Sequence, residues 1–373
     1  MSTIDAYQES FDLEPGYLDW AAFGPLSPLV REEGVADLEL LGTGRAAAID
    51  QVHARAASAP ELIARLIGGR ADAVTLQPSA TSGLMQAIFG ITGGLLLSRH
   101  EFPSLTVAAT RAAEALHVVE PVWMDPPAGY VTPEVVAEAL TPGIRAVAVS
   151  LVDYRTGYRA DLTALREVIG DRLLIVDATQ GFGVVHADYA AADVVCGHGY
   201  KWLRAGRGTG FAWFSDRALE HLSPVFSGIT GTDAYGPTET VLPVSHGANA
   251  FTVSRPDHIA AARLAAALTE LHDVGVDAIE RVVGERTQHI LSLAERYGLS
   301  TVTPREAERR AGIVALTPAS TDVAALAGTL ANHGVTCTTR AGLVRLSAHA
   351  GTGADTMTML GDALAAFAQS RVW

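Results

Sequence analysis

An aspartate and a lysine lie in one Gly-rich stretch of the sequence, each shortly after an apolar run. Asp177 follows LLIV, and Lys201 follows VVCGHGY. If both runs are buried parallel strands, the two side chains emerge at the same edge of a sheet. A lysine can form a Schiff base with an aldehyde, and an aspartate can keep a pyridine nitrogen protonated. The pair therefore predicts a site for pyridoxal 5′-phosphate (PLP), with Lys201 and Asp177 as catalytic residues.

Each of these residues also has a structural interpretation. Lys201 could be a solvated surface lysine, although its apolar and glycine neighbours argue against this. Asp177 could cap a turn before Gly181. A pyridinium N–H is the favoured partner, because a buried carboxylate without a partner is costly. Gln180 could donate to the phenolic oxygen of the cofactor or satisfy the backbone of its own loop.

Two further motifs could bind anions. The run SATSG at 79–83 follows one predicted strand and opens a predicted helix. Free N–H groups and hydroxyls at such a helix start can bind a phosphate, but the run could equally be an ordinary helix cap. Arg345 lies inside the apolar segment LVRLS, where a guanidinium needs an anion. That anion could be a substrate α-carboxylate or a buried Asp or Glu in a structural pair.

The elements that must position these residues follow from the apolar runs. Helical patterns such as TPEVVAEALT separate many of the runs, which indicates βαβ units. We therefore expect an α/β fold with a mostly parallel seven-stranded sheet flanked by helices. The predicted strands are 73–77, 94–98, 118–124, 144–152, 172–179, 192–197 and 208–214.

The pattern changes at Asp257, where two long helices are expected over 257–272 and 277–297. Short strands at 312–318 and 342–347 and a final helix at 355–368 complete a smaller α+β unit. The predicted domains are an N-terminal segment of the small domain at the active-site entrance, a large PLP-binding domain and a small C-terminal domain. Their ranges are 1–30, 31–256 and 257–373.

Composition limits the classes of function. The 373 residues are 49% hydrophobic, which suffices for a large core, and the formal net charge is −14. This charge argues against nucleic acid or an anionic membrane as a partner. The two cysteines lie in apolar segments, and the N-terminal residues show no signal-peptide pattern, so we expect a reduced, cytoplasmic protein. We also find no G-x-G-x-x-G motif of a nicotinamide-dependent enzyme.

Together these motifs resemble fold-type I PLP enzymes of the class V aminotransferase group, which includes cysteine desulfurases, kynureninases and isopenicillin epimerase-like proteins. The resemblance runs from about Gly16 to the end and is most specific in D-A-x-Q…K-W. It implies that Lys201 carries the cofactor, that Asp177 pairs with its pyridine nitrogen and that Gln180 lies near its phenolic oxygen. It also implies a phosphate site built from Thr81, Ser82, His198 and Tyr200.

Further roles rest on the same resemblance. Phe102, in EFPS, would stack on the cofactor ring, and Tyr154, in DYRTG, would lie beside it. Ser254, in TVSRP, would contact the phosphate of the other subunit, which implies a homodimer with shared active sites. Arg345 would bind the substrate carboxylate.

The sequence also departs from its relatives. Cysteine desulfurases carry a catalytic cysteine shortly after R-x-G, but RAGLVRLS has none, and Cys337 is interpreted as a buried strand cysteine. Gln180 stands where kynureninases have a histidine, and SGITGT lacks their tryptophan and histidine. Both cysteine desulfurase activity and kynurenine as the substrate are therefore disfavoured.

The expected reaction starts from an L-α-amino acid that replaces Lys201 on the cofactor. Lys201 then removes the Cα proton. The kynureninase-like Phe102, Tyr154 and Tyr200 favour a β-lyase or deamination outcome. Transamination with a keto acid is the main alternative, and epimerisation or PLP binding without turnover are further ones.

Overall fold

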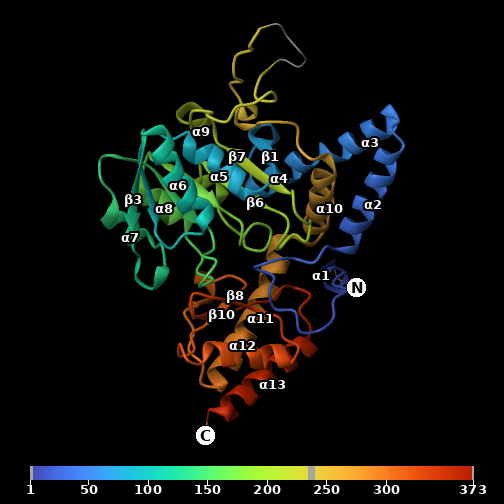
Figure 1. The fold of residues 1–373 in the computed structure, drawn as a ribbon, viewed down its shortest axis with the longest axis vertical. Helices are drawn as coiled ribbons and strands as arrows, with labels where there is room; N and C mark the ends of the chain where they lie inside the picture. The colour runs from blue at the N-terminus through green and yellow to red at the C-terminus, as the bar shows by residue number, and fades with distance from the viewer. Residues whose placement is uncertain (1–2, 234–239, 372–373) are drawn as a thin grey trace.

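The computed structural model describes residues 3–233 and 240–371. Figure 1 shows a large helix-covered sheet in the upper part of the molecule and a smaller helical unit, drawn in orange and red, below it. Within the described residues, none of the helices combines the length and the apolar character that crossing a bilayer requires.

The large sheet confirms the predicted fold class. It has seven strands in the order β1-β7-β6-β5-β4-β2-β3. β7 runs antiparallel to both of its neighbours, and the other pairs are parallel. The strands are β1 (Val74–Gln77), β2 (Gly93–Ser98), β3 (Val119–Met124), β4 (Ile144–Ser150), β5 (Leu173–Asp177), β6 (Val194–His198) and β7 (Gly210–Phe214). Each lies within or beside a run that the sequence predicts as a strand.

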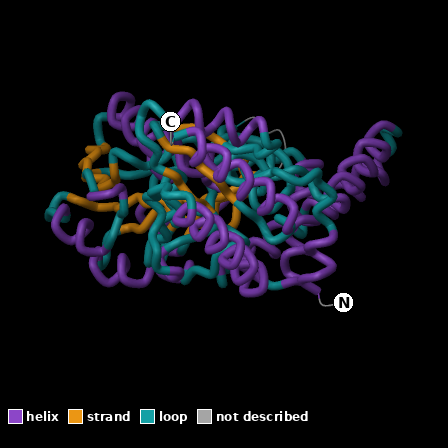
Figure 2. The backbone as a smooth tube through the Cα atoms, turned by 90° about the horizontal axis from the view of Figure 1, so that it is seen from below, coloured by secondary structure: helices purple, strands orange, loops and turns teal. Residues whose placement is uncertain are grey.

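Alternating strand residues face two separate cores, as expected for a sheet that is covered on both sides. Leu95 and Leu97 pack with α5 (Ala80–Phe89), α6 (Pro103–Leu116) and α9 (Asp216–His221). Leu96 faces the other core, which contains residues of α4 (Ala59–Ile67), α7 (Pro133–Ala139), α8 (Leu162–Ile169) and α10 (His258–Val274). Figure 2 shows the strands enclosed by helices in this way.

The smaller unit contains an antiparallel sheet in the order β8-β10-β9. Its strands are β8 (Ile313–Leu316), β9 (Thr338–Arg340) and β10 (Leu343–Ser347), and its helices are α11 (Val276–Arg296), α12 (Val323–Asn332) and α13 (Ala354–Ser370). The sequence did not predict β9 or α12. β9 has only three residues, too few for a periodic pattern.

The N-terminal segment joins both parts of the molecule. After α1 (Thr3–Glu9), Tyr17 and Asp19 form bridges with Thr336 and Ser347 of the small unit. α2 (Pro28–Gly42) and α3 (Ala46–Ala56) then form the arm at the right of Figures 1 and 2 and pack on α10. The exact domain boundaries, including the one at residue 257, stay a prediction.

Candidate active site

The sheet brings Asp177 and Lys201 to the same edge. Asp177 is the last residue of β5, and Lys201 lies three residues beyond the end of the neighbouring strand β6. Asp177 is 4% exposed and Lys201 is 6% exposed. The interpretation of Lys201 as a solvated surface residue is therefore wrong.

The two groups influence each other's protonation. Burial lowers the pKa of Lys201 to about 8, and the negative charge of Asp177 opposes this effect. Burial raises the pKa of Asp177, while hydrogen bonds from Thr179 and the charge of Lys201 lower it. The backbone N–H of Thr179 donates to Asp177 Oδ1 at 3.0 Å. The site thus combines an amine that is partly neutral near pH 8 with a buried carboxyl that can accept a cationic partner.

Aromatic rings surround the lysine. The Nζ atom of Lys201 lies 5.7 Å from the ring centroid of Phe102 and 5.6 Å from that of Tyr200. The Tyr154 ring contacts Phe102 edge-to-face at a centroid distance of 5.1 Å. Phe102 and Tyr154 come from two loops that are far apart in sequence, so the fold brings these predicted residues together at Lys201.

His198 has a buried ring nitrogen with no partner. Its ring stacks on Tyr200 at a centroid distance of 3.7 Å, and its Nδ1 atom has no hydrogen bond within the described part of the chain. Burial, with a smaller contribution from Lys201, holds the pKa of His198 well below its usual value. His198 is therefore a neutral imidazole next to Lys201 that can donate a hydrogen bond to a ligand.

The predicted phosphate motif starts α5. The Oγ atom of Ser79 caps the helix by accepting from the N–H of Ser82 at 3.1 Å. The exposed Thr81 hydroxyl pairs with that of Ser104 at 2.7 Å. Ser79 also packs so closely on β7 that a side chain at Gly210 would collide with it. The run is thus a true helix cap, and its hydroxyls and N–H groups also provide the donors that a phosphate needs.

Gln180 is held by the protein at both ends of its amide. Its oxygen accepts from the indole N–H of Trp202 at 2.9 Å, and its nitrogen donates to the carbonyl of Ala21 at 3.0 Å. These bonds fix the loop after β5 against the residues that follow Lys201. The predicted role of Gln180 at a phenolic oxygen stays a prediction.

Arg345 has an acidic partner that the sequence analysis did not identify. Its guanidinium lies 3.5 Å from Asp19 Oδ1 and donates to the backbone oxygen of Tyr154 at 2.9 Å. The charges of Arg345 and Asp19 both act on Lys201, which places this pair at the site. The available signal was a charged residue inside the apolar stretch GYLDWAAF.

The segment before Arg345 is a tight hairpin. Ala341 and Gly342 connect β9 to β10, both with positive φ, as in a two-residue turn. The Arg340 guanidinium lies 5.4 Å from the Tyr154 ring centroid at the end of this hairpin. Cys337 is half-buried against the small-unit core, and burial raises its pKa to about 11. This thiol is therefore poorly suited to act as a nucleophile.

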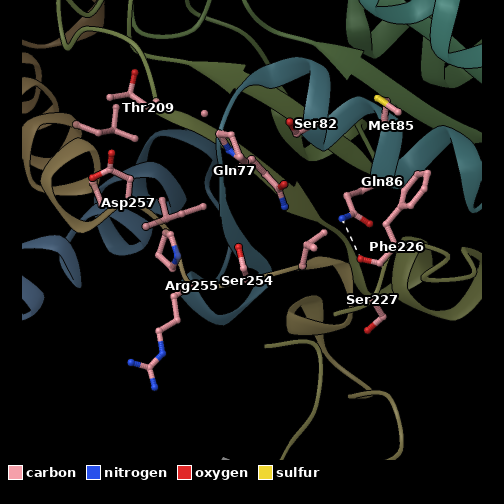
Figure 3. A pocket seen from close by; sticks show the side chains of 18 residues that line it. Gln77, Ser82, Met85, Gln86, Thr209, Phe226, Ser227, Ser254, Arg255 and Asp257 are labelled. Carbon is pink, nitrogen blue, oxygen red and sulfur yellow. Dashed lines mark hydrogen bonds between the residues drawn. The ribbon is translucent and has the colours of Figure 1, made fainter. Parts of the chain in front are cut away.

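Ser254 lines a separate cavity. It is exposed and lines a cavity of about 680 Å³ together with Gln77, Ser82 and Thr209, as Figure 3 shows. The cavity reaches the first turn of α5 through Ser82, and Lys201 is not among its lining residues.

The described residues fit PLP. Lys201 supplies a buried amine, Asp177 a buried carboxyl, and His198 an imidazole nitrogen without a protein partner. The α5 start adds hydroxyl and N–H donors for a phosphate. This donor set matches an aldehyde, a pyridine nitrogen and a phosphate on one cofactor.

Comparison with known proteins matches most of the chain to one protein family. The family model described as aminotransferase class-V matches residues 44–346. A kynureninase of Deinococcus radiodurans is 32% identical over 174 residues, which cover 44% of this chain and 42% of that protein. This match therefore spans less than half of the relative's length. A kynureninase of Pseudomonas fluorescens is 25% identical over 329 residues, covering 81% of this chain and 77% of that protein.

Solved structures share the fold. The cystine C–S lyase C-DES in complex with its reaction product cysteine persulfide has a TM-score of 0.84 and 20% identity, covering 95% of this chain and 97% of that chain. An apo cysteine desulfurase from Thermococcus onnurineus has a TM-score of 0.85 and 16% identity, with 95% of both chains covered. At these identities the similarity establishes the fold alone.

Proposed function

Because the chain belongs to the class V aminotransferase family of PLP-dependent enzymes, we propose that it eliminates a β-substituent from an L-α-amino acid. The observation that carries this proposal is the cluster of Lys201, Phe102 and Tyr154, which places a basic amine and a phenol in one aromatic site. When bound, PLP supplies an electron-withdrawing ring that stabilises negative charge at the substrate Cα.

Lys201 and Asp177 have the central roles in this proposal. Asp177 holds the proton on the pyridine nitrogen, because a buried carboxylate gains most from a cationic hydrogen-bond partner. With a pKa of about 8, Lys201 is neutral in a substantial fraction of molecules near pH 7.5. Its Nζ atom can therefore take the Cα proton, a step worth about 10²–10⁴-fold in rate.

Arg345 and Tyr154 complete the assignment. Arg345 binds the α-carboxylate, and its bond to the Tyr154 carbonyl keeps the guanidinium in place. The Tyr154 phenol gives its proton to the departing group as the bond to Cβ breaks. With water as the source of the keto oxygen, the products are a 2-keto acid, ammonia and the protonated leaving group.

The hairpin at Arg340 supports elimination without a protein thiol. Its two-residue turn carries no cysteine, and burial raises the pKa of the half-buried Cys337 thiol to about 11. A leaving sulfur group would therefore depart as a free product. One structural neighbour is a cystine C–S lyase, and C–S cleavage is a reaction of this class.

A substrate panel tests the proposal. The purified holoenzyme is incubated with cystine, β-chloroalanine, alanine and kynurenine, and ammonia, 2-keto acid and pyridoxamine phosphate are measured. Elimination gives equal amounts of ammonia and keto acid from the β-substituted substrates and no pyridoxamine phosphate. Pyridoxamine phosphate with keto acid and no ammonia would instead indicate transamination and would contradict the proposal.

We also propose that the chain acts as a homodimer in which Ser254 contacts the phosphate bound by the other subunit. The support is that Ser254 is exposed beside a cavity, and that Val253 and Ile229 nearby are 55% and 81% exposed. Sedimentation of the holoenzyme tests this. A monomer that binds PLP tightly, or Ser254→Ala with unchanged PLP affinity, would refute it.

A further inference from the structure

A buried carboxyl group next to the candidate site has no role in the proposed reaction. Glu101 is 6% exposed and directly precedes Phe102, the N-cap residue of α6. Its Oε1 accepts from the backbone N–H of Ser150 at 3.2 Å, and its Oε2 lies 2.5 Å from the Ser150 hydroxyl. The carboxyl group thus connects the turn after β2 to the end of β4.

The contact between Glu101 and Ser150 matters because of the position of Ser150 in the sheet. Ser150 ends β4 and is in register with Asp177 at the end of β5. On the other side, the pairing of β4 with β2 stops at Ala148, opposite Leu97. β2 therefore offers no backbone carbonyl to the Ser150 N–H, and the Glu101 carboxyl group accepts this hydrogen bond instead. An unpaired buried N–H would be costly.

The turn after β2 also contains Phe102, an aromatic residue of the candidate site. Phe102 lies 5.7 Å from Lys201 Nζ and edge-on to Tyr154. Glu101 is therefore covalently adjacent to Phe102, and its side chain is hydrogen-bonded to Ser150 at the strand end that is in register with Asp177. We therefore expect that loss of the Glu101 side chain would displace both the Phe102 turn and the end of β4.

We propose that Glu101 is a positioning residue that ties the Phe102 turn to the strand end beside Asp177. The inference rests on PLP binding at this site and not on the reaction branch. The product assay can therefore fail without affecting it.

The surrounding charges favour the uncharged form. Burial raises the pKa of Glu101 to about 8, and the negative charges of Asp153 and Asp177 add to this effect, while the hydrogen bonds from Ser150 oppose it. Asp153 faces Glu101 from the loop after β4, and Asp177 from β5. Ionisation of Glu101 would put a second negative charge beside Asp177 and disturb the site as pH rises through about 8.

Two substitutions separate this role from simple stabilisation. Glu101→Gln keeps a neutral group that can accept from the Ser150 N–H and donate to its hydroxyl, whereas Glu101→Ala leaves both without a partner. Asp193→Asn is the matched control, because Asp193 is a buried carboxylate immediately before β6, where it accepts from the N–H of Leu174. It therefore lies at the opposite edge of the same sheet.

The measurements are the PLP dissociation constant, the absorbance of bound PLP against pH, and the melting temperature of the apo-protein. We expect Glu101→Ala to weaken PLP binding by at least about fivefold. Glu101→Gln should bind like the wild type and lack one protonation step near pH 8. Asp193→Asn should lower the melting temperature and leave PLP affinity unchanged.

The outcomes decide between the two roles. If Glu101→Ala melts earlier but binds PLP like the wild type, Glu101 is only a structural residue and the proposal is overturned. It is also overturned if Glu101→Gln loses as much affinity as Glu101→Ala, because a charged carboxylate would then be required.

Discussion

The buried Arg345 and the half-buried Asp19 form an ion pair, with 3.5 Å between the guanidinium Nη2 and the carboxylate Oδ1. The two residues lie at opposite ends of the chain and meet where Asp19 bridges to Ser347. Both interpretations of Arg345 that the sequence left open are therefore compatible. The arginine has a structural partner, and its Nε still has no hydrogen bond in the described part of the chain.

Asp19→Asn should lower the KM for the amino acid. Asp19 competes with a substrate carboxylate for the same guanidinium, and the Tyr154 carbonyl keeps Arg345 in place without it. Removing one negative charge near the carboxylate should reduce KM by about three- to tenfold, with a smaller change in kcat. Steady-state kinetics measure this, with Arg345→Lys as the comparison that should raise KM. A raised KM in Asp19→Asn would show that Asp19 is needed to orient Arg345.

Lys201→Ala should remove the covalent link to PLP. The wild-type protein should be yellow, with a visible band that borohydride abolishes, whereas the variant should bind PLP only reversibly and lack turnover. Absorbance spectra and mass spectrometry after reduction are the measurements. Lys201 is the only lysine of the chain, so a wild-type protein that binds PLP but shows no aldimine band and no PLP adduct after reduction would contradict the assignment.

The rate of PLP capture by the apo-protein should follow the neutral fraction of Lys201. Because burial depresses its pKa from 10.5 to about 8, the rate should rise with pH and level off above about pH 8. The same shift means that neutral Lys201 stabilises the apo-protein above pH 10.5 and that this stabilisation is lost as pH falls through about 8. Stopped-flow mixing of apo-protein with PLP tests the kinetic expectation. A midpoint near 10.5 would show that the amine is solvated.

Cys337→Ser should leave turnover almost unchanged. The thiol is half-buried and has a pKa raised to about 11, and the hairpin that follows it carries no cysteine. Assays with a thiol-alkylating reagent give a second check, since the wild type should keep its activity after treatment. Loss of activity in Cys337→Ser would reopen the desulfurase interpretation.

Asp193→Ala should destabilise the fold without changing PLP affinity. The Asp193 carboxylate, 5% exposed, bonds to Arg166, Arg217, Ser215 and the N–H of Leu174. Removing one partner of a buried ion network costs about 3–5 kcal/mol. Burial alone would raise the pKa of Asp193, but the hydrogen bonds and the arginine charges lower it overall, so its stabilisation should be lost as pH falls below 3.8. Urea unfolding at pH 7 and at pH 3 measures both effects.

The positions of Lys201 and Asp177 could be predicted because they depend on local sequence patterns. Apolar runs predict buried strands, and polar residues directly after parallel strands must emerge at one edge. The same reasoning located all seven strands of the large sheet. It did not find β9, because a three-residue strand forms only when its partner is present.

The sequence by itself determined the chemical groups of the site and the strands that carry them, because residue types and apolar periodicity are local properties of a chain. Only the tertiary structure decided that Asp19 pairs with Arg345, that Glu101 completes the end of β4, and that Gln180 is held by Trp202. Each of these contacts joins segments that are distant in sequence. Their partners depend on how the packed layers bring loops together, and no local pattern encodes that distance.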